Sequence, residues 1–268
     1  MTFATLYAMR GALAEDSMYF IVSVLALGAA ALGGLVAALA YDPGDYMRRA
    51  WALIGLCYVL LVVDTLAFGI TSRSAERDIS ALGAVTSATL TFVANVCSVV
   101  GTVLIARAWR AAGLDLGVSA AVRWVAMLLS LALALWLVGE GAWHDVQTLL
   151  GGDWRALVYL ASSLGDIVSL ALVAPILLTA YALRGGSLGW PWALLALSSV
   201  GWLLYSAAGG SLGALVLGPA AEAAARPLEE SLRTFACLAQ LCAGLLQASV
   251  LAASEQPLPA RPAFARMP

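Results

Sequence analysis

Long apolar runs separated by short polar stretches dominate the sequence. A helix that crosses a bilayer needs about 20 mostly apolar residues, and seven runs meet that length. They cover residues 18–41, 50–72, 80–106, 117–139, 156–183, 189–209 and 232–253. Turn-forming residues stand at the joints, as in Asp42-Pro43-Gly44-Asp45 after the first run. The pattern predicts an all-α integral membrane protein, a seven-helix bundle with its termini on opposite sides.

These spans divide the chain into three predicted segments. Residues 1–17 form an extracytoplasmic N-terminal segment, residues 18–253 the membrane bundle, and residues 254–268 a cytoplasmic proline-containing tail. Glu15 and Asp16 directly precede the first run, the wrong flank for a cleaved signal peptide, so we expect the first helix to be retained. The segment 210–230 contains an apolar stretch at 212–219. This segment is apolar enough to lie on the membrane surface or to dip into the membrane.

Composition agrees with a membrane protein and excludes several cofactors. The chain is 62% apolar and 11% charged, against roughly half and a quarter in soluble domains. All 14 basic side chains are arginines, which leaves no lysine for a retinal Schiff base. His144 is the one histidine, so paired-histidine haem is excluded and zinc, which needs about three protein ligands, is disfavoured. We expect no cofactor and no metal site, although Glu140, His144 and Asp145 are spaced as potential ligands.

The four cysteines are the remaining candidates for covalent or metal chemistry. All four fall inside apolar runs and none in a loop: Cys57, Cys97, Cys237 and Cys242. This placement argues against a disulfide framework.

Loop arginines indicate the orientation. The loops after the first, third and fifth spans, together with the C-terminal tail, hold eight arginines, and the other side holds six. Arg48, Arg49, Arg107 and Arg110 on the first side lie close to span ends. Because positively charged loops stay in the cytoplasm, we expect a multi-pass protein of a bacterial inner membrane with its N-terminus outside and its C-terminus in the cytoplasm.

Two parts of the chain look alike. Trp-Ala-Leu at 51–53 in the second span recurs at 192–194 in the sixth, and residues 94–97 resemble residues 239–242. Spans 1–3 then correspond to spans 5–7, with span 4 as the linker that gives both triplets the same orientation, a parallel repeat of the kind found in transporters. The alternative is chance recurrence of short apolar words.

Side-chain patterns also indicate which helix faces lipid. Polar residues recur at helical spacing on spans 2, 3, 5, 6 and 7, and such residues turn toward protein or water. Span 4 has little polarity and should be the most lipid-exposed. Span 1 carries Ala29-Gly33-Ala37 and a parallel row at 30, 34 and 38, a pattern that lets backbones approach closely. This Gly/Ala face can pack inside the bundle or against a second copy or partner.

Seven side chains form a predicted polar layer in the outer half of the bundle. Counting about 1.5 Å per residue from the outer helix ends places most of them at a shared depth, with Asn95 a turn deeper. Carboxylates, amides, a hydroxyl and aromatic rings are what a small-ligand pocket contains. The candidate ligand-binding residues are Asp64, Thr91, Asn95, Asp166, Trp202, Tyr205 and Gln240.

Asp64 and Asp166 are the most informative members of this layer. No arginine lies at comparable depth in either of their helices. Each can be a neutral acid hydrogen-bonded across the bundle, a counter-ion for a cation, or a proton carrier. Arg233 is a potential partner if the sixth loop folds inward, and Pro175 in the same helix as Asp166 is a potential hinge.

The stretch from Leu164-Gly165-Asp166 through Pro175 and on to 184–192 resembles the multi-helix membrane input regions of bacterial sensor proteins. That resemblance implies a receptor whose output lies in a separate partner. The layout of three spans, a linker and three spans is also similar to microbial rhodopsins, here without the lysine for retinal, and to PQ-loop sugar transporters, here without the Pro-Gln dipeptide.

Three functions follow from these patterns. The first is a receptor-like seven-helix protein that binds a small or lipophilic ligand in the outer half of the bundle and signals to a separate partner. The second is a proton-linked small-molecule transporter in which Asp64 and Asp166 alternate between protonated and charged states. The third is a non-catalytic subunit of a larger membrane complex, with the Gly/Ala face or the tail as its contact. No enzymatic activity is expected; an intramembrane hydrolase that uses both aspartates is the one enzymatic alternative.

Overall fold

Seven long helices make up the structure, a computed structural model that describes residues 15–69, 80–111, 119–153, 156–182, 189–208 and 221–254. All seven are long and apolar enough to cross a membrane. They are α2 (Glu15–Leu39), α3 (Tyr46–Phe68), α4 (Ala81–Ala111), α5 (Ala120–Leu150), α6 (Ala156–Ala182), α7 (Gly189–Ala208) and α9 (Ala221–Ser254). The predicted seven-helix bundle is confirmed, and the chain is a multi-pass membrane protein.

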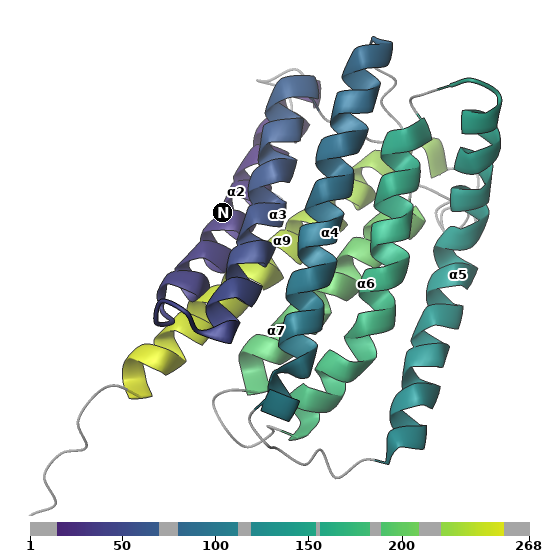
Figure 1. The fold of residues 1–268 in the computed structure, drawn as a ribbon. Helices are drawn as coiled ribbons and strands as arrows, with labels where there is room; N and C mark the ends of the chain where they lie inside the picture. The colour runs from purple at the N-terminus through teal and green to yellow at the C-terminus, as the bar shows by residue number, and fades with distance from the viewer. Residues whose placement is uncertain are drawn as a thin grey trace, which may run out of the picture.

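Six of these helices form a closed ring. Each packs against two neighbours in the order α2, α3, α4, α6, α7 and α9, and α9 returns to α2. The seventh helix, α5, lies outside the ring, mainly against α6, and stands at the edge of the molecule in Figure 1. In the most apolar stretch of α5, only 11% of the residues are buried, against 39–50% in the corresponding stretches of the other six helices. This confirms that the fourth span is the most lipid-exposed.

The ring has the two-fold neighbour pattern that the sequence repeat predicts. If α2, α3 and α4 correspond to α6, α7 and α9, each contact within the first triplet has its equivalent in the second. The contact between α4 and α6 then corresponds to the contact between α9 and α2. Trp51 and Trp192, which the repeat places at equivalent positions, are both buried in the main apolar core. The neighbours in the ring agree with the repeat, and the similarity of the two halves stays a prediction.

Glycines let α2 approach both of its neighbours. A Cβ atom on Gly244 of α9 would lie 2.0 Å from the carbonyl oxygen of Gly33, and one on Gly34 would lie 2.7 Å from the Cα of Gly55 in α3. Such separations are possible only between residues without side chains. The Gly/Ala face of the first span, for which a partner was one option, therefore packs inside the bundle.

Two helices extend furthest beyond the predicted spans, each by 11 residues. α5 continues to Leu150, so Glu140, His144 and Asp145, expected in an outer loop, lie within it. α9 begins at Ala221 rather than at residue 232. In both stretches the helix is longer than the apolar run, because the added residues include polar side chains that interrupt the run and strong helix formers such as Ala, Glu and Leu that continue the helix.

Several predicted features lie outside the described residues. These are most of the N-terminal segment, the tail beyond residue 254, the apolar stretch at 212–219 and the side chain of Pro175. Trp143 of α5 and Trp190 of α7 are exposed on the surface of the bundle.

Candidate functional site

Two adjoining polar chambers lie between the ring helices. The first has a volume of about 100 Å³ and lies toward the end of the bundle where α2 begins, and the second, of about 70 Å³, lies deeper. Both are bounded by Leu61, Thr91, Ser162 and Trp202. One water molecule needs about 10–15 Å³ by this kind of measure. Each chamber therefore has room for several waters or a small guest, less than the roughly 300 Å³ of a drug-sized pocket.

All seven candidate residues line one or both chambers. The first chamber receives Asp64, Thr91, Trp202 and Tyr205. The second receives Thr91, Asn95, Asp166, Trp202 and Gln240. The single layer expected from the sequence is thus divided into two levels, with Trp202 and Thr91 between them. That these residues bind a ligand stays a prediction.

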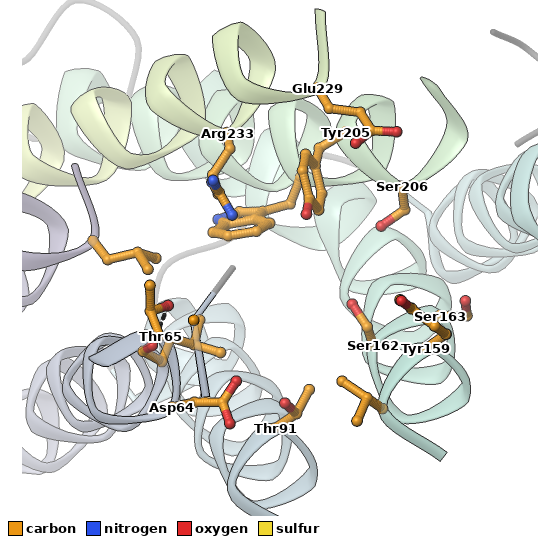
Figure 2. A pocket seen from close by; sticks show the side chains of 15 residues that line it. Asp64, Thr65, Thr91, Tyr159, Ser162, Ser163, Tyr205, Ser206, Glu229 and Arg233 are labelled. Atoms are coloured by element: carbon orange, nitrogen blue, oxygen red, sulfur yellow. Dashed lines mark hydrogen bonds between the residues drawn. The ribbon is translucent and has the colours of Figure 1, made fainter. Parts of the chain in front are cut away.

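Asp64 lies near the end of α3 and is 6% exposed. The helix closes directly after it, since the Gly69 amide donates to the Thr65 carbonyl at 2.9 Å and Gly69 takes a φ of 77°. Asp64 Oδ1 has no hydrogen-bond partner among the described residues. Figure 2 shows Asp64 and Thr91 on one side of the chamber, opposite Arg233 and Tyr205.

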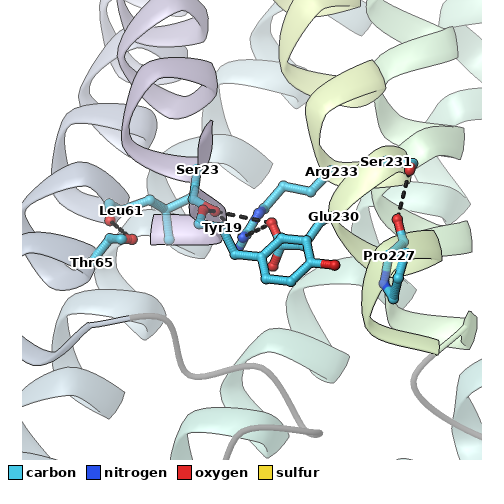
Figure 3. A network of polar contacts seen from close by, with 8 residues as sticks. All are labelled: Tyr19, Ser23, Leu61, Thr65, Pro227, Glu230, Ser231 and Arg233. Atoms are coloured by element: carbon cyan, nitrogen blue, oxygen red, sulfur yellow. Dashed lines mark hydrogen bonds and ion pairs between the residues drawn. The ribbon is translucent and has the colours of Figure 1, made fainter. Parts of the chain in front are cut away.

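Arg233 belongs to a buried ionic cluster between α2 and α9. It donates to Glu230 and to Ser23, and Ser23 donates to Glu230 Oε2 at 3.0 Å (Figure 3). Its guanidinium also lies over the Tyr205 ring, 5.6 Å from the centroid. Arg233, expected near the start of the last span and as a potential partner of the buried aspartates, lies within α9. The ion-pair partner that the structure gives it is Glu230.

Aromatic side chains separate the two chambers. Trp202 Nε1 donates to the Tyr58 hydroxyl at 2.9 Å, and that hydroxyl lies 3.4 Å from Ser198 Oγ. The Trp202 ring meets Tyr205 edge-on, with centroids 5.5 Å apart. This network links α3 to α7, so it fixes the indole where the chambers adjoin.

The second chamber is bounded by hydrogen-bonded polar groups. Ser206, which lines the first chamber, donates to Asp166, which lines the second. Asn95 Nδ2 donates to the Ala161 carbonyl of α6 at 3.0 Å. Gln240 is 1% exposed, and its Nε2 has no partner among the described residues. Asn95 and Gln240, equivalent in the sequence repeat, thus line the same chamber.

Polar groups continue beyond the second chamber toward the opposite end. Ser98 and Thr102 line its wall. Farther along, Gln247 Nε2 donates to the Tyr41 hydroxyl at 2.8 Å. Burial, together with the nearby charge of Asp45, raises the pKa of Tyr41 to about 12. The bundle therefore carries polar side chains along much of its length.

Several polar residues of this region were not indicated by the sequence, among them Ser23, Ser206, Glu229 and Glu230. Glu229 and Glu230 were counted in the sixth loop because the apolar run begins after them. The helix-forming residues on both sides of Pro227, at 221–226 and 228–232, were the signal that could have placed them on the last helix, although a proline inside a helix argues against it. Ser23 and Ser206 are single hydroxyls in apolar runs, where no periodic pattern distinguishes them.

Within the described segments, no three His, Cys, Asp or Glu side chains are grouped so that they could hold a metal ion. Comparison with known proteins finds no matching family model, no matching curated protein and no matching solved structure. The fold and the site define the chain as a seven-helix membrane protein with a polar interior of two adjoining chambers.

Proposed function

We propose that this protein is a receptor-like membrane protein that binds a small polar ligand in the first chamber. One observation carries the proposal: all six ring helices contribute to the lining of this chamber. A ligand that contacts six helices favours one arrangement of the ring over others, and it shifts the conformational equilibrium by its difference in affinity for them. A separate partner would read that change.

The chemistry of the lining favours a polar over a lipophilic ligand. Asp64, Glu229 and Arg233 bring charges to the wall, and Thr91 and Ser162 bring hydroxyls. A purely apolar guest would leave these groups without hydrogen bonds, at a cost in free energy for each group.

The proposal includes the membrane orientation. With the protein in a bacterial inner membrane and its N-terminus outside, the first chamber belongs to the outer half of the bundle and is reached from outside the cell. The arginines at the start of α3 and at the end of α4 then face the cytoplasm.

The same geometry supports ligand binding over catalysis. Asp64 lines the first chamber and Asp166 the second. An aspartate pair that activates water must present both carboxyl groups to the same water. We propose that the protein is not an enzyme.

A thermal-shift screen tests the proposal. The full-length chain in nanodiscs is unfolded in the presence of small cationic, anionic and neutral polar compounds. We expect at least one compound to raise the unfolding midpoint in a saturable way. Trp202→Ala should abolish this response, whereas Trp136→Ala, which removes a 72% exposed ring on α5, should preserve it. A library without any active compound, or a response that Trp202→Ala leaves intact, contradicts the proposal.

Proton-linked transport is the second candidate, and it is favoured by the polar groups that continue past Trp202. Thr102, Gln247 and Tyr41 extend the polar interior toward the opposite end of the bundle. Uptake into proteoliposomes that follows an imposed pH gradient and is lost in Asp166→Asn would favour transport over reception. The complex-subunit alternative receives no support from the Gly/Ala face, because α3 and α9 cover its glycines.

A further inference from the structure

The first chamber contains a carboxylate without a fixed counter-ion. Asp64 is 6% exposed, and its Oδ1 accepts no hydrogen bond from the described residues. A charged group at this depth is costly unless a partner compensates it. Arg233 lines the same chamber, but its guanidinium donates to Glu230 and Ser23. The charge of Arg233 is therefore already matched by Glu230, and Asp64 requires a different cation or a proton.

The space beside Asp64 has the chemistry to receive a cation. Thr91 and Ser162 place hydroxyl oxygens on the wall. Trp202 and Tyr205 supply aromatic rings, against which the aliphatic part of an ammonium compound can pack. Glu229 adds a second carboxylate to the lining. Oxygen acceptors and aromatic rings around a carboxylate are a set that an ammonium group with several N–H donors can satisfy.

The size of the chamber restricts the ligand further. A volume of about 100 Å³ admits a few heavy atoms beside the carboxylate. A proton alone would neutralise Asp64 and leave this space to water molecules. A small ammonium compound neutralises the charge and also fills the space.

We propose that the first chamber is a binding site for a small ligand with a primary ammonium group, in which Asp64 is the counter-ion and Thr91 a further acceptor. This inference rests on the proposed ligand-binding function and specifies its ligand class. The ammonium N–H groups donate to the Asp64 carboxylate and to the Thr91 hydroxyl, and the aliphatic end of the ligand faces Trp202.

Ethylammonium chloride serves as the probe, with the full-length chain in nanodiscs and the unfolding midpoint as the readout. We expect a saturable rise in the midpoint. Ethanol, a neutral molecule of similar size, and tetramethylammonium chloride, a cation without N–H donors, should give no comparable rise. Sodium chloride at the same concentration controls for ionic strength.

Matched variants assign the effect to the chamber. Asp64→Asn should weaken ethylammonium binding by about tenfold or more, because hydrogen bonds to charged groups contribute roughly 1.5–3 kcal/mol. Asp42→Asn, in the exposed turn after α2, should leave the affinity unchanged. If Asp64→Asn does not fold, Thr91→Val decides the question. It should weaken binding several-fold, whereas Thr86→Val on the exposed face of the same helix should not.

The outcomes separate this inference from the function on which it rests. Equal saturable stabilisation by sodium chloride, or unchanged affinity in both Asp64→Asn and Thr91→Val, overturns the ammonium assignment. If neutral or anionic compounds stabilise the protein through Trp202 and ethylammonium does not, the ligand class is wrong and the proposed function stands. If no compound of any charge binds, both fail.

Discussion

Arg233 and Glu230 form an ion pair that water does not reach, since they are 6% and 0% exposed. Removal of one member of such a pair leaves an uncompensated buried charge, which costs about 3–5 kcal/mol. We expect Arg233→Met to lower the free energy of unfolding by about 3 kcal/mol, measured by equilibrium unfolding in mixed detergent micelles.

Two comparisons test the source of this loss. Arg107→Met, at an exposed position of α4, should leave stability nearly unchanged. The double variant Arg233→Met/Glu230→Gln should lose less than the two single variants together, because the charge that each single variant leaves behind is then absent. Additive losses would mean that the two side chains act independently.

Tyr41 leads to a prediction about alkaline pH. Its pKa is raised from 10.0 to about 12 by burial and by the charge of Asp45. The folded state thus favours the protonated phenol of Tyr41. This preference stabilises the fold fully below pH 10, and the stabilisation is lost as pH rises from 10 to about 12. No lysine titrates in this window, because the chain has none.

We expect Tyr41→Phe to lose less stability than the unmodified protein between these two pH values. Unfolding by denaturant at several pH values measures the difference. Tyr181→Phe, at a side chain that is 56% exposed, is the matched control and should follow the unmodified protein. Parallel curves for all three proteins would contradict the prediction.

Single residues of the candidate site could be found from the sequence, because carboxylates and amides are rare within apolar runs. Their grouping could not be found in this way. Counting residues gives a position along the helix axis, whereas the chamber that a side chain enters also depends on helix rotation and tilt. Asp166 and Gln240, expected at the depth of Asp64, therefore line the second chamber.

Close packing of α2 against α9 depends on the absence of side chains where the two helices meet. We expect Gly244→Ala to destabilise the protein by about 1–3 kcal/mol, the usual cost of overpacking, because the new Cβ would lie 2.0 Å from the Gly33 carbonyl oxygen. Thermal unfolding in nanodiscs measures the change.

Gly28 supplies the matched control on the same helix pair. A Cβ there would meet no atom within 4 Å, and alanine has the higher helix propensity by up to about 1 kcal/mol. Gly28→Ala should therefore be neutral or slightly stabilising. If Gly244→Ala behaves like Gly28→Ala, the two helices are not in close contact at this point.

Helices were easier to predict than their ends. Seven apolar runs of spanning length are visible without any structure, since the bilayer sets the length of each run. Hydropathy reports where a helix leaves the membrane, and hydrogen bonding decides where the helix ends. α5 and α9 continue through Trp143 and Glu229, where the apolar runs have already ended or not yet begun.

The whole molecule combines a six-helix ring that encloses polar groups with one helix that is packed outside it. This arrangement agrees with the scarcity of polar side chains in α5 between residues 120 and 139, where the helix has no chamber to line. The ring has the two-fold pattern of the repeat, and α5 falls outside that pattern as the linker between its halves.

Tryptophan fluorescence can test this arrangement directly. Trp136 of α5 is 72% exposed, and Trp51 of α3 is 2% exposed. Lipids with brominated acyl chains quench the fluorescence of indoles that they touch. Trp136→Phe should therefore reduce the part of the emission that these lipids quench. Trp51→Phe should reduce the part that they do not quench. If lipid quenched Trp51, the buried face of α3 would face lipid and the order of the six helices in the bundle would be wrong. The polar chambers would then open into hydrocarbon, where their charged groups have no compensation.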